Sequence, residues 1–243
     1  MNFVATILIA FALAFLNCAA QRRPKVGIEN TPVKISNESY ASKLNSLATE
    51  RQKLAEEYRK SAGNKQEVLE KARRVFVSSI DRNIFPFWYG TDWDFNGVTE
   101  TPREGKIACG YFVTTVLRDA GLRLSRVSLA QQASEKIIKS LTTAPYIKRF
   151  HNAPIEKFVD EVKKSGVGLY IVGLDIHVGF ILNTGEEIYF IHSSYLEPSE
   201  VIREKAIGSP ILRTSRYRVI GKISADDELI TKWLNQTAIP TLR

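Results

Sequence analysis

The sequence predicts an α+β protein, in which a mainly helical N-terminal half is followed by an antiparallel sheet. Apolar residues recur at helical spacing over much of residues 40–164, and from residue 166 three strand-like runs follow one another with short turns between them. Helices first and strands after them are typical of the α+β class. The length of 243 residues fits one domain of ordinary size plus an N-terminal appendage. We therefore divide the chain into residues 1–20, 21–80 and 81–243.

The first 20 residues, MNFVATILIAFALAFLNCAA, carry no charged side chain and end in small residues. This pattern predicts a secretory signal peptide cleaved after Ala20, and hence an exported protein that is periplasmic, at the cell surface or secreted. No basic residue precedes the apolar run, whereas Arg22 and Arg23 follow it. An uncleaved membrane anchor is therefore the alternative. Lipidation of Cys18 is less favoured than cleavage, because the residues before it are a poor lipoprotein motif.

Residues 21–37 are polar, contain two prolines and are predicted to form a linker. Two helices are expected next, over about residues 40–60 and 65–80, with a break at Ser61-Ala62-Gly63-Asn64 between them. The first is predicted from apolar side chains at steps of three and four: Tyr40, Leu44, Leu47, Leu54 and Tyr58. Together they would form a helical hairpin that packs on the main domain.

Most of the positive charge lies in this N-terminal part. The net charge is +8, and residues 21–80 account for +6 of it, with 13 Lys+Arg against 7 Asp+Glu. Such an excess suits an anionic surface, such as cell wall or membrane, although the solvated faces of helices explain most of these charges more simply. No basic stripe alternates with aromatic residues, which argues against nucleic acid as a partner.

Residues 81–107 are predicted to be irregular and are rich in aromatic side chains. So many aromatic residues in one segment indicate either the wall of a groove or a loop held on the core, and for each residue the core is the simpler interpretation. The aromatic residues are Phe85, Phe87, Trp88, Tyr89, Trp93 and Phe95.

Cys109 is predicted to begin a helix. The sequence ACGYFVTTVLRDAGL, residues 108–122, has apolar residues at helical spacing and a glycine where the helix should stop. The positive end of a helix stabilises a thiolate, so we expect a lowered pKa for Cys109 and a functional thiol. Removal or membrane anchoring of Cys18 leaves Cys109 without an intrachain partner, and a small buried apolar residue is the alternative interpretation.

The rest of the chain is predicted to hold two or three helices in residues 126–164, then four strands and a closing helix. The strands are expected at residues 166–175, 176–183, 186–194 and 216–224, and the helix at residues 225–235.

Two of the three histidines, His177 and His192, fall in consecutive strands joined by a short turn. With Thr184 and Gly185 as a two-residue loop, the two histidines would be directly opposite each other, with side chains on one face of the sheet. A loop of three residues would break this alignment, so the prediction depends on the turn.

Neighbouring imidazoles suit a general base and a residue that orients it. One ring would take a proton from a nucleophile, here Cys109, while the other would fix its tautomer. Two half-exposed histidines without a shared task are the alternative.

The segments ACGYFVTTVLRDAGL and HVGFILNTGEEIYFIHSS resemble the NlpC-type cell-wall cysteine peptidases. The resemblance implies a papain-like core with a nucleophile helix on an antiparallel sheet, Cys109 as nucleophile, His177 as base and His192 as orienting residue. It also implies an oxyanion-binding or substrate-lining role for Tyr89, with Trp88 beside it, in the sequence WYGTDW.

The chain also departs from the family pattern. It has Ala-Cys-Gly-Tyr around Cys109 where Asp-Cys-Ser-Gly is usual, and residues 126–164 lengthen the interval to His177.

The function expected from these residues is hydrolysis of amide or isopeptide bonds, in the stem peptides of peptidoglycan, by an exported cysteine hydrolase that needs no cofactor. One alternative is an acyltransferase or protein peptidase on the same fold, because papain-like folds support these activities too. Another is a cell-wall-binding module without catalysis. A zinc site formed by Cys109, His177 and His192 is the least favoured, because metal ligands usually show tight local spacing.

Overall fold

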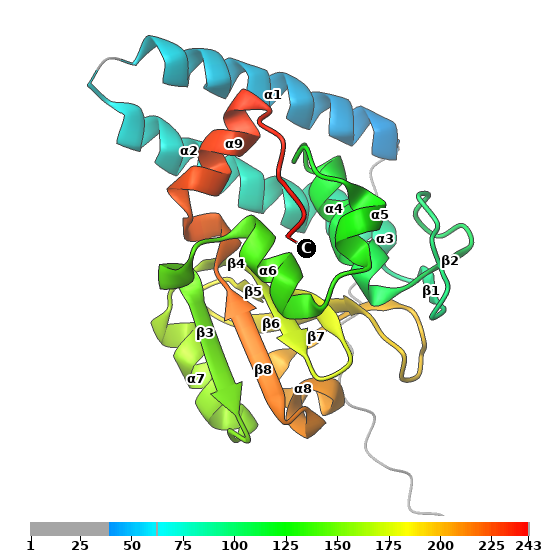
Figure 1. Ribbon diagram of the computed structural model, residues 1–243. Helices are drawn as coiled ribbons and strands as arrows, with labels where there is room; N and C mark the ends of the chain where they lie inside the picture. Colours follow the sequence, from blue (N-terminus) through cyan, green and yellow to red (C-terminus); the bar gives the residue numbers. More distant parts are fainter. Residues whose placement is uncertain (1–38, 62, 243) are drawn as a thin grey trace, which may run out of the picture.

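The computed structural model describes residues 39–61 and 63–242 (Figure 1). In the described residues, six α-helices and two short 3-10 or π segments precede the main sheet, and three α-helices with two 3-10 segments lie within or after it. The α-helices are α1 (Tyr40–Lys60), α2 (Lys65–Ser79), α3 (Phe85–Trp88), α4 (Cys109–Asp119), α5 (Arg126–Ala130), α6 (Ser134–Leu141), α7 (Ile155–Lys164), α8 (Pro210–Thr214) and α9 (Asp227–Asn235). The π-helix is η1 (Ile80–Ile84), and the 3-10 segments are η2 (Ala144–Tyr146), η3 (Ala206–Gly208) and η4 (Ile223–Ala225).

The main sheet has six antiparallel strands in the order β3-β8-β4-β5-β6-β7. These strands are β3 (Ile147–His151), β4 (Gly168–Leu174), β5 (Val178–Asn183), β6 (Ile188–Ser193), β7 (Val201–Lys205) and β8 (Tyr217–Gly221). A separate parallel pair, β1 (Asp92–Trp93) and β2 (Lys106–Ile107), precedes α4. The architecture is therefore α+β with an antiparallel sheet, as predicted.

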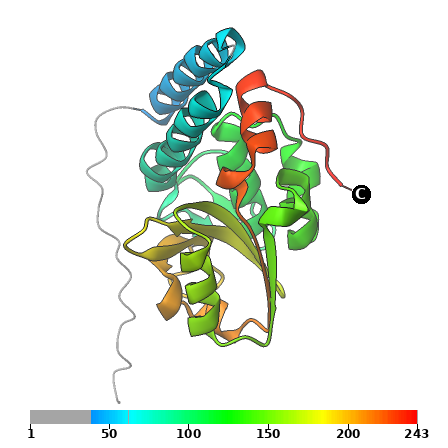
Figure 2. The same ribbon diagram turned by 90° about the vertical axis from the view of Figure 1, so that its left-hand side faces the viewer.

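Helices cover both faces of the sheet (Figure 2). Each face has its own apolar core. On one face, Phe112 of α4 packs on Phe180 of β5. The opposite face holds a smaller core, to which α7 contributes Phe158 and α8 contributes Leu212. Alternation along β5 and β6 divides their side chains between the two cores, so these central strands are buried on both faces.

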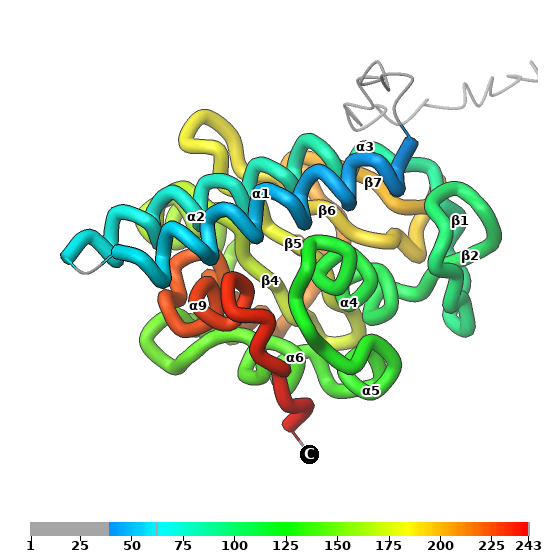
Figure 3. Tube along the Cα trace, turned by 90° about the horizontal axis from the view of Figure 1, so that it is seen from above, coloured from blue at the N-terminus to red at the C-terminus, as the bar shows by residue number. Residues whose placement is uncertain are grey.

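The α1–α2 hairpin lies along the outside of the larger core, and α9 packs beside it (Figures 1 and 3). Trp233 of α9 contacts Phe76 of α2 edge-on, with ring centroids 5.3 Å apart, and donates from Nε1 to the Ala120 carbonyl at the end of α4. The hairpin expected over residues 40–80 is therefore present, and it shares one core with the helix that begins at Cys109.

Three parts of the predicted secondary structure need correction. Residues 81–107 are not wholly irregular, since α2 continues through η1 into α3 and the β1–β2 pair follows. Residues 126–164 are not wholly helical, because residues 147–151 form edge strand β3. Strand β7, the opposite edge of the sheet, was not predicted.

The predicted signal peptide or anchor at residues 1–20 and the linker at residues 21–37 lie outside the described residues. In the part of the chain that the structure describes, no helix combines the length and apolar character required to cross a membrane.

Candidate functional site

Cys109 is the first residue of α4, as the sequence predicted. The helix is anchored to the sheet by Phe112, which contacts Phe85 and Phe180. Its first turn is also held closely by α5, because a Cβ on Gly110 would lie only 2.4 Å from the Ala130 carbonyl oxygen. A glycine after the cysteine therefore allows the two helices to approach, and this contact fixes the position of the thiol.

The Cys109 thiol is half-buried and faces the start of β5. Burial raises its pKa, and the backbone N–H groups of Val178, Gly110 and Cys109 itself oppose that shift without cancelling it. The lowered pKa expected from the helix terminus is therefore wrong for this structure, because desolvation outweighs the favourable N–H groups. The contact with the Val178 N–H places the sulfur beside the residue that follows His177 in the chain.

The β5–β6 hairpin turns one residue later than the sequence suggested. Gly185 has a φ of 92°, and the Thr184 N–H donates to the Glu187 carbonyl at 3.0 Å, so the two-residue loop is Gly185-Glu186. Because both ends of the loop move by one residue, the pairing of the strands shifts by two. Asn183 consequently pairs with Ile188 rather than with Glu186.

The prediction that the two histidines lie directly opposite each other is wrong, but the prediction that they share a face of the sheet is confirmed. The observed register extends to place His192 opposite Gly179, and His177 opposite Ser194. A shift of two residues preserves the face of every side chain, so His177 and His192 are diagonal neighbours. Their ring centroids are 5.0 Å apart, and Nε2 of His177 lies 2.9 Å from Nδ1 of His192.

Both imidazoles are buried and neutral. Burial lowers the pKa of His192 to about 3, and burial together with the neighbouring His192 holds the pKa of His177 well below its usual range. The ring of His192 is stacked on Phe190, with centroids 3.9 Å apart. No hydrogen bond within the described residues joins His177 to the Cys109 thiol, and Nδ1 of His177 has no hydrogen-bond partner there.

Glu204 of β7 is a member of the site that sequence analysis missed. Its Oε1 lies 3.2 Å from Nε2 of His192, and its side chain is almost completely buried. Burial raises the pKa of this carboxyl, while a hydrogen bond from Ser209 opposes the shift. The residues VIREK show no alternation of apolar and polar side chains, so nothing in the sequence predicted β7 or placed Glu204 beside the histidines.

Tyr195 also belongs to the site, and it lies two residues after the end of β6. Its ring contacts the edge of His177, with centroids 5.3 Å apart, and Trp93 lies on its other side. Burial raises the pKa of the Tyr195 phenol, and the Cys109 thiol adds to that shift. The tyrosine therefore connects His177 with the surroundings of the thiol.

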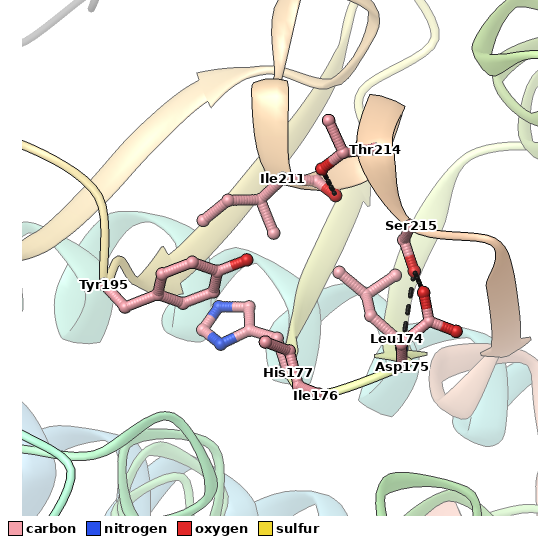
Figure 4. A pocket seen from close by; sticks show the side chains of 8 residues that line it. All are labelled: Leu174, Asp175, Ile176, His177, Tyr195, Ile211, Thr214 and Ser215. Carbon is pink, nitrogen blue, oxygen red and sulfur yellow. Dashed lines mark hydrogen bonds between the residues drawn. The ribbon is translucent and has the colours of Figure 1, made fainter.

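A cavity of about 180 Å³ opens beside these two rings (Figure 4). The Tyr195 hydroxyl points along the cavity towards Ile211, and the His177 ring lies beneath the phenol. Thr214 and Ser215 supply hydroxyl groups on the far wall, where Asp175 accepts a hydrogen bond from Ser215. His177 is thus accessible from a small, partly polar cavity although most of its ring is buried.

Trp88 and Tyr89 lie outside the site formed around Cys109 and the two histidines. Trp88 is 0% exposed, packs on Phe112 and donates from Nε1 to the Tyr40 hydroxyl, so the prediction that it lines the substrate site is wrong. The Tyr89 phenol is buried beside the ion pair of Arg203 and Asp81, and burial raises its pKa. Since Arg203 and Glu204 are consecutive strand residues, Tyr89 lies at the face of β7 opposite to Glu204.

The third histidine, His151, is on edge strand β3 with its ring against Tyr217, outside this site. Among residues 39–61 and 63–242, no group of three or more His, Cys, Asp or Glu side chains is arranged to hold a metal ion. The hydrogen bond between the two histidine rings engages a nitrogen of each, which disfavours the zinc site considered from the sequence.

Comparison with known proteins gives no match. No family model matches the chain, and neither a curated protein nor a solved structure matches it. The function must therefore be argued from the geometry of the site.

Proposed function

We propose that the protein is an exported thiol hydrolase with a papain-like core of the NlpC type, which cleaves amide or isopeptide bonds in cell-wall peptide. The observation that carries the proposal is the position of Cys109. The thiol begins a helix on the sheet and contacts the backbone of Val178, next to a histidine whose Nε2 is engaged by a second histidine. This arrangement leaves Nδ1 of His177 as the nitrogen able to accept a proton.

The reaction begins from a neutral thiol and a neutral imidazole. When substrate binds, the Cys109 proton passes to Nδ1 of His177 and the sulfur attacks the carbonyl carbon. The imidazolium then protonates the leaving amine as the carbon–nitrogen bond breaks, which leaves a thioester on Cys109. Water, deprotonated by His177, hydrolyses the thioester and restores the thiol.

Two kinds of donor are available for the oxyanion that forms during the attack. The N–H groups at the start of α4 lie around the sulfur, and the Tyr195 hydroxyl lies in the adjoining cavity. Preorganised donors of this kind stabilise developing charge, and loss of one costs about 10²–10³ in kcat. Tyr195 takes the role that the resemblance assigned to Tyr89.

The decisive experiment compares the chain lacking residues 1–20 with its Cys109→Ala variant on purified peptidoglycan. Mass spectrometry should find new peptide fragments with the wild-type chain only, and their masses identify the bond. His177→Ala should abolish release as well. If fragments appear with Cys109→Ala, the assignment of the nucleophile is wrong.

A cell-wall-binding module without catalysis is the second candidate, and one observation favours it. The thiol has a raised pKa and no hydrogen bond to His177, which is the state expected of an inert buried cysteine. Such a module would co-sediment with peptidoglycan equally well with and without Cys109→Ala, and neither form would release fragments.

A further inference from the structure

A line of three buried polar side chains crosses three strands of the sheet. It begins at His177 before β5, continues through His192 of β6 and ends at Glu204 of β7, with contacts of 2.9 and 3.2 Å. Both contacts are diagonal: the β5–β6 register places His192 opposite Gly179 rather than His177, and His192 pairs with Ile202 rather than with Glu204. His192 is 0% exposed and Glu204 is 5% exposed, so water cannot replace either contact easily.

Whether Glu204 is ionised or protonated decides the donor-to-acceptor direction of both hydrogen bonds along this line. A neutral imidazole has one N–H donor and one acceptor nitrogen, so a donor at one end of the line forces the orientation of every bond. When Glu204 is ionised, it accepts from Nε2 of His192, whose Nδ1 accepts from Nε2 of His177. Nδ1 of His177 then carries a lone pair.

Protonation of Glu204 reverses the donor and acceptor roles in both hydrogen bonds. The carboxylic acid donates to Nε2 of His192, and His192 donates from Nδ1 to Nε2 of His177. His177 then carries its proton on Nδ1, the nitrogen that must accept the thiol proton. One proton on Glu204, which is separated from the thiol by the two histidines, therefore decides whether His177 can act as a base.

We propose that Glu204 is a positioning residue that fixes the tautomers of both histidines, and that its protonation switches His177 from the base-competent tautomer to the incompetent one. The catalytic consequence rests on the proposed thiol hydrolase, whereas the tautomer assignment rests on the contacts alone.

Among the residues that the structure describes, no cationic side chain pairs with Glu204 to hold it ionised in acid. Ser209, before α8, and His192, on β6, are the polar side chains facing it. Arg203 and Lys205, its neighbours on β7, pair with Asp81 and Glu187.

Two arginines on the elements packed on this face are also engaged elsewhere. Arg213 of α8 pairs with Glu156 of α7, and buried Arg218 of β8 donates to backbone carbonyls, including those of Ala153 and Leu212. Burial consequently dominates and raises the pKa of Glu204 above that of an exposed carboxyl. The switch therefore occurs at higher pH than an ordinary glutamate would titrate.

The test is nitrogen NMR of the full chain labelled at its histidine rings. There are three histidines, and His151→Gln and His192→Gln assign the signals. We expect His177 and His192 to carry their protons on Nε2 at neutral pH, and both to move to Nδ1 together as the pH falls through the titration of Glu204. Glu204→Gln should abolish this transition, because its amide donates or accepts at every pH.

Glu187→Gln, which removes a half-buried carboxylate at the far end of the hairpin, is the matched control and should leave the transition intact. A proton on Nδ1 of His177 in the wild type at neutral pH overturns the proposal, as does an unchanged transition in Glu204→Gln. The wild-type titration decides the question even if the variant does not fold.

A second readout separates this inference from the proposed function. In the pH profile of kcat/KM on a peptide substrate, the acid limb should follow the tautomer transition and disappear in Glu204→Gln, with kcat lower by roughly 10- to 100-fold. If the tautomers change with the protonation of Glu204 but the protein shows no turnover, the tautomer switch is supported and the proposed hydrolase is refuted. If the protein turns over substrate but the acid limb does not follow the tautomer transition, the hydrolase is supported and the tautomer switch is refuted.

Discussion

Gly179 lies opposite His192 on the adjacent strand, and its lack of a side chain makes room for the buried ring. A Cβ at this position would lie 2.7 Å from the Phe190 ring and 2.8 Å from Cβ of His192. We therefore expect Gly179→Ala to push the stacked Phe190 and His192 rings apart and to lower the free energy of unfolding by about 1–3 kcal/mol. Urea denaturation measures this loss, and hydrolysis should fall with it because the contact between the histidines lengthens.

Gly63→Ala provides the control for that substitution. Nothing lies within 4 Å of a Cβ at Gly63, in the connection between α1 and α2, so the free energy of unfolding should remain within about 0.5 kcal/mol of wild type. An equal loss from both substitutions would show that the effect at Gly179 is not caused by the rings.

The state of the thiol gives a second prediction at the residue scale. Because burial raises the pKa of Cys109, iodoacetamide should alkylate it more slowly at pH 7 than it alkylates an exposed cysteine, and the rate should climb on the alkaline side. The measurement uses a chain carrying Cys18→Ser, in which Cys109 is the remaining thiol. Rapid alkylation at pH 7 would instead indicate a thiolate paired with protonated His177.

At the scale of elements, one carboxylate joins the start of α9 to the end of α6. Asp226 caps α9 by accepting from the Glu228 and Leu229 N–H groups, and its other oxygen accepts from Thr142 and Thr143. These bonds hold the pKa of Asp226 below its usual value although burial opposes them. Asp226→Ala should therefore cost roughly 1–3 kcal/mol of unfolding free energy.

The pH dependence identifies the cause of that loss. A carboxyl with a lowered pKa in the folded state contributes stability that is present above its unfolded pKa, near 3.8, and is lost as the pH falls through the folded pKa. The difference between wild type and Asp226→Ala in urea melts should thus narrow below about pH 4. Asp160→Asn, on the exposed face of α7, is the control, and a difference independent of pH would contradict the role of the charge.

The elements that the sequence predicts well are those with a strong pattern. The helices α1 and α4 and the strands β4 to β6 lie where apolar periodicity placed them. The edge strands β3 and β7 were not predicted, because neither IKRFH nor VIREK has the alternating or continuous apolar pattern that indicates a strand. In β3, Phe150 is the one buried residue. Strand pairing over long distances in the sequence, rather than local preference, creates both edges.

The candidate site was predicted in the same uneven way. Cys109, His177 and His192 could be selected because residue type and local pattern sufficed. The turn at Gly185 was misplaced by one residue, but the period of two kept both histidines on one face. Glu204 could not be found, since its relation to His192 exists only once β7 pairs with β6.

At the scale of the whole molecule, the site depends on both cores. Cys109 is fixed by the larger core, which includes Phe112, whereas Phe190 and the histidine line lie against the smaller core on the opposite face. The thiol and the imidazole come near each other at the end of the sheet where β5 begins, where Cys109 contacts the Val178 N–H. No local sequence pattern encodes that meeting, because it requires the packing of α4, α7 and α8 on one sheet.

Burial of two neutral histidines also makes the stability of the whole molecule depend on pH. Their pKa values are lower in the folded than in the unfolded chain, so their contribution is fully present above the unfolded pKa of about 6.5 and is lost as the pH falls below it. His192→Gln removes one such group, so between pH 6 and 5 its unfolding free energy should fall less steeply than that of wild type, by up to about 1.4 kcal/mol per pH unit. Urea melts across this range measure both slopes, with His151→Gln as the control outside the site. Equal slopes in wild type and His192→Gln would mean that His192 is protonated in the folded chain. A charged His192 donates from both nitrogens, so the hydrogen bonds from His177 through His192 to Glu204 could not then all run in one direction.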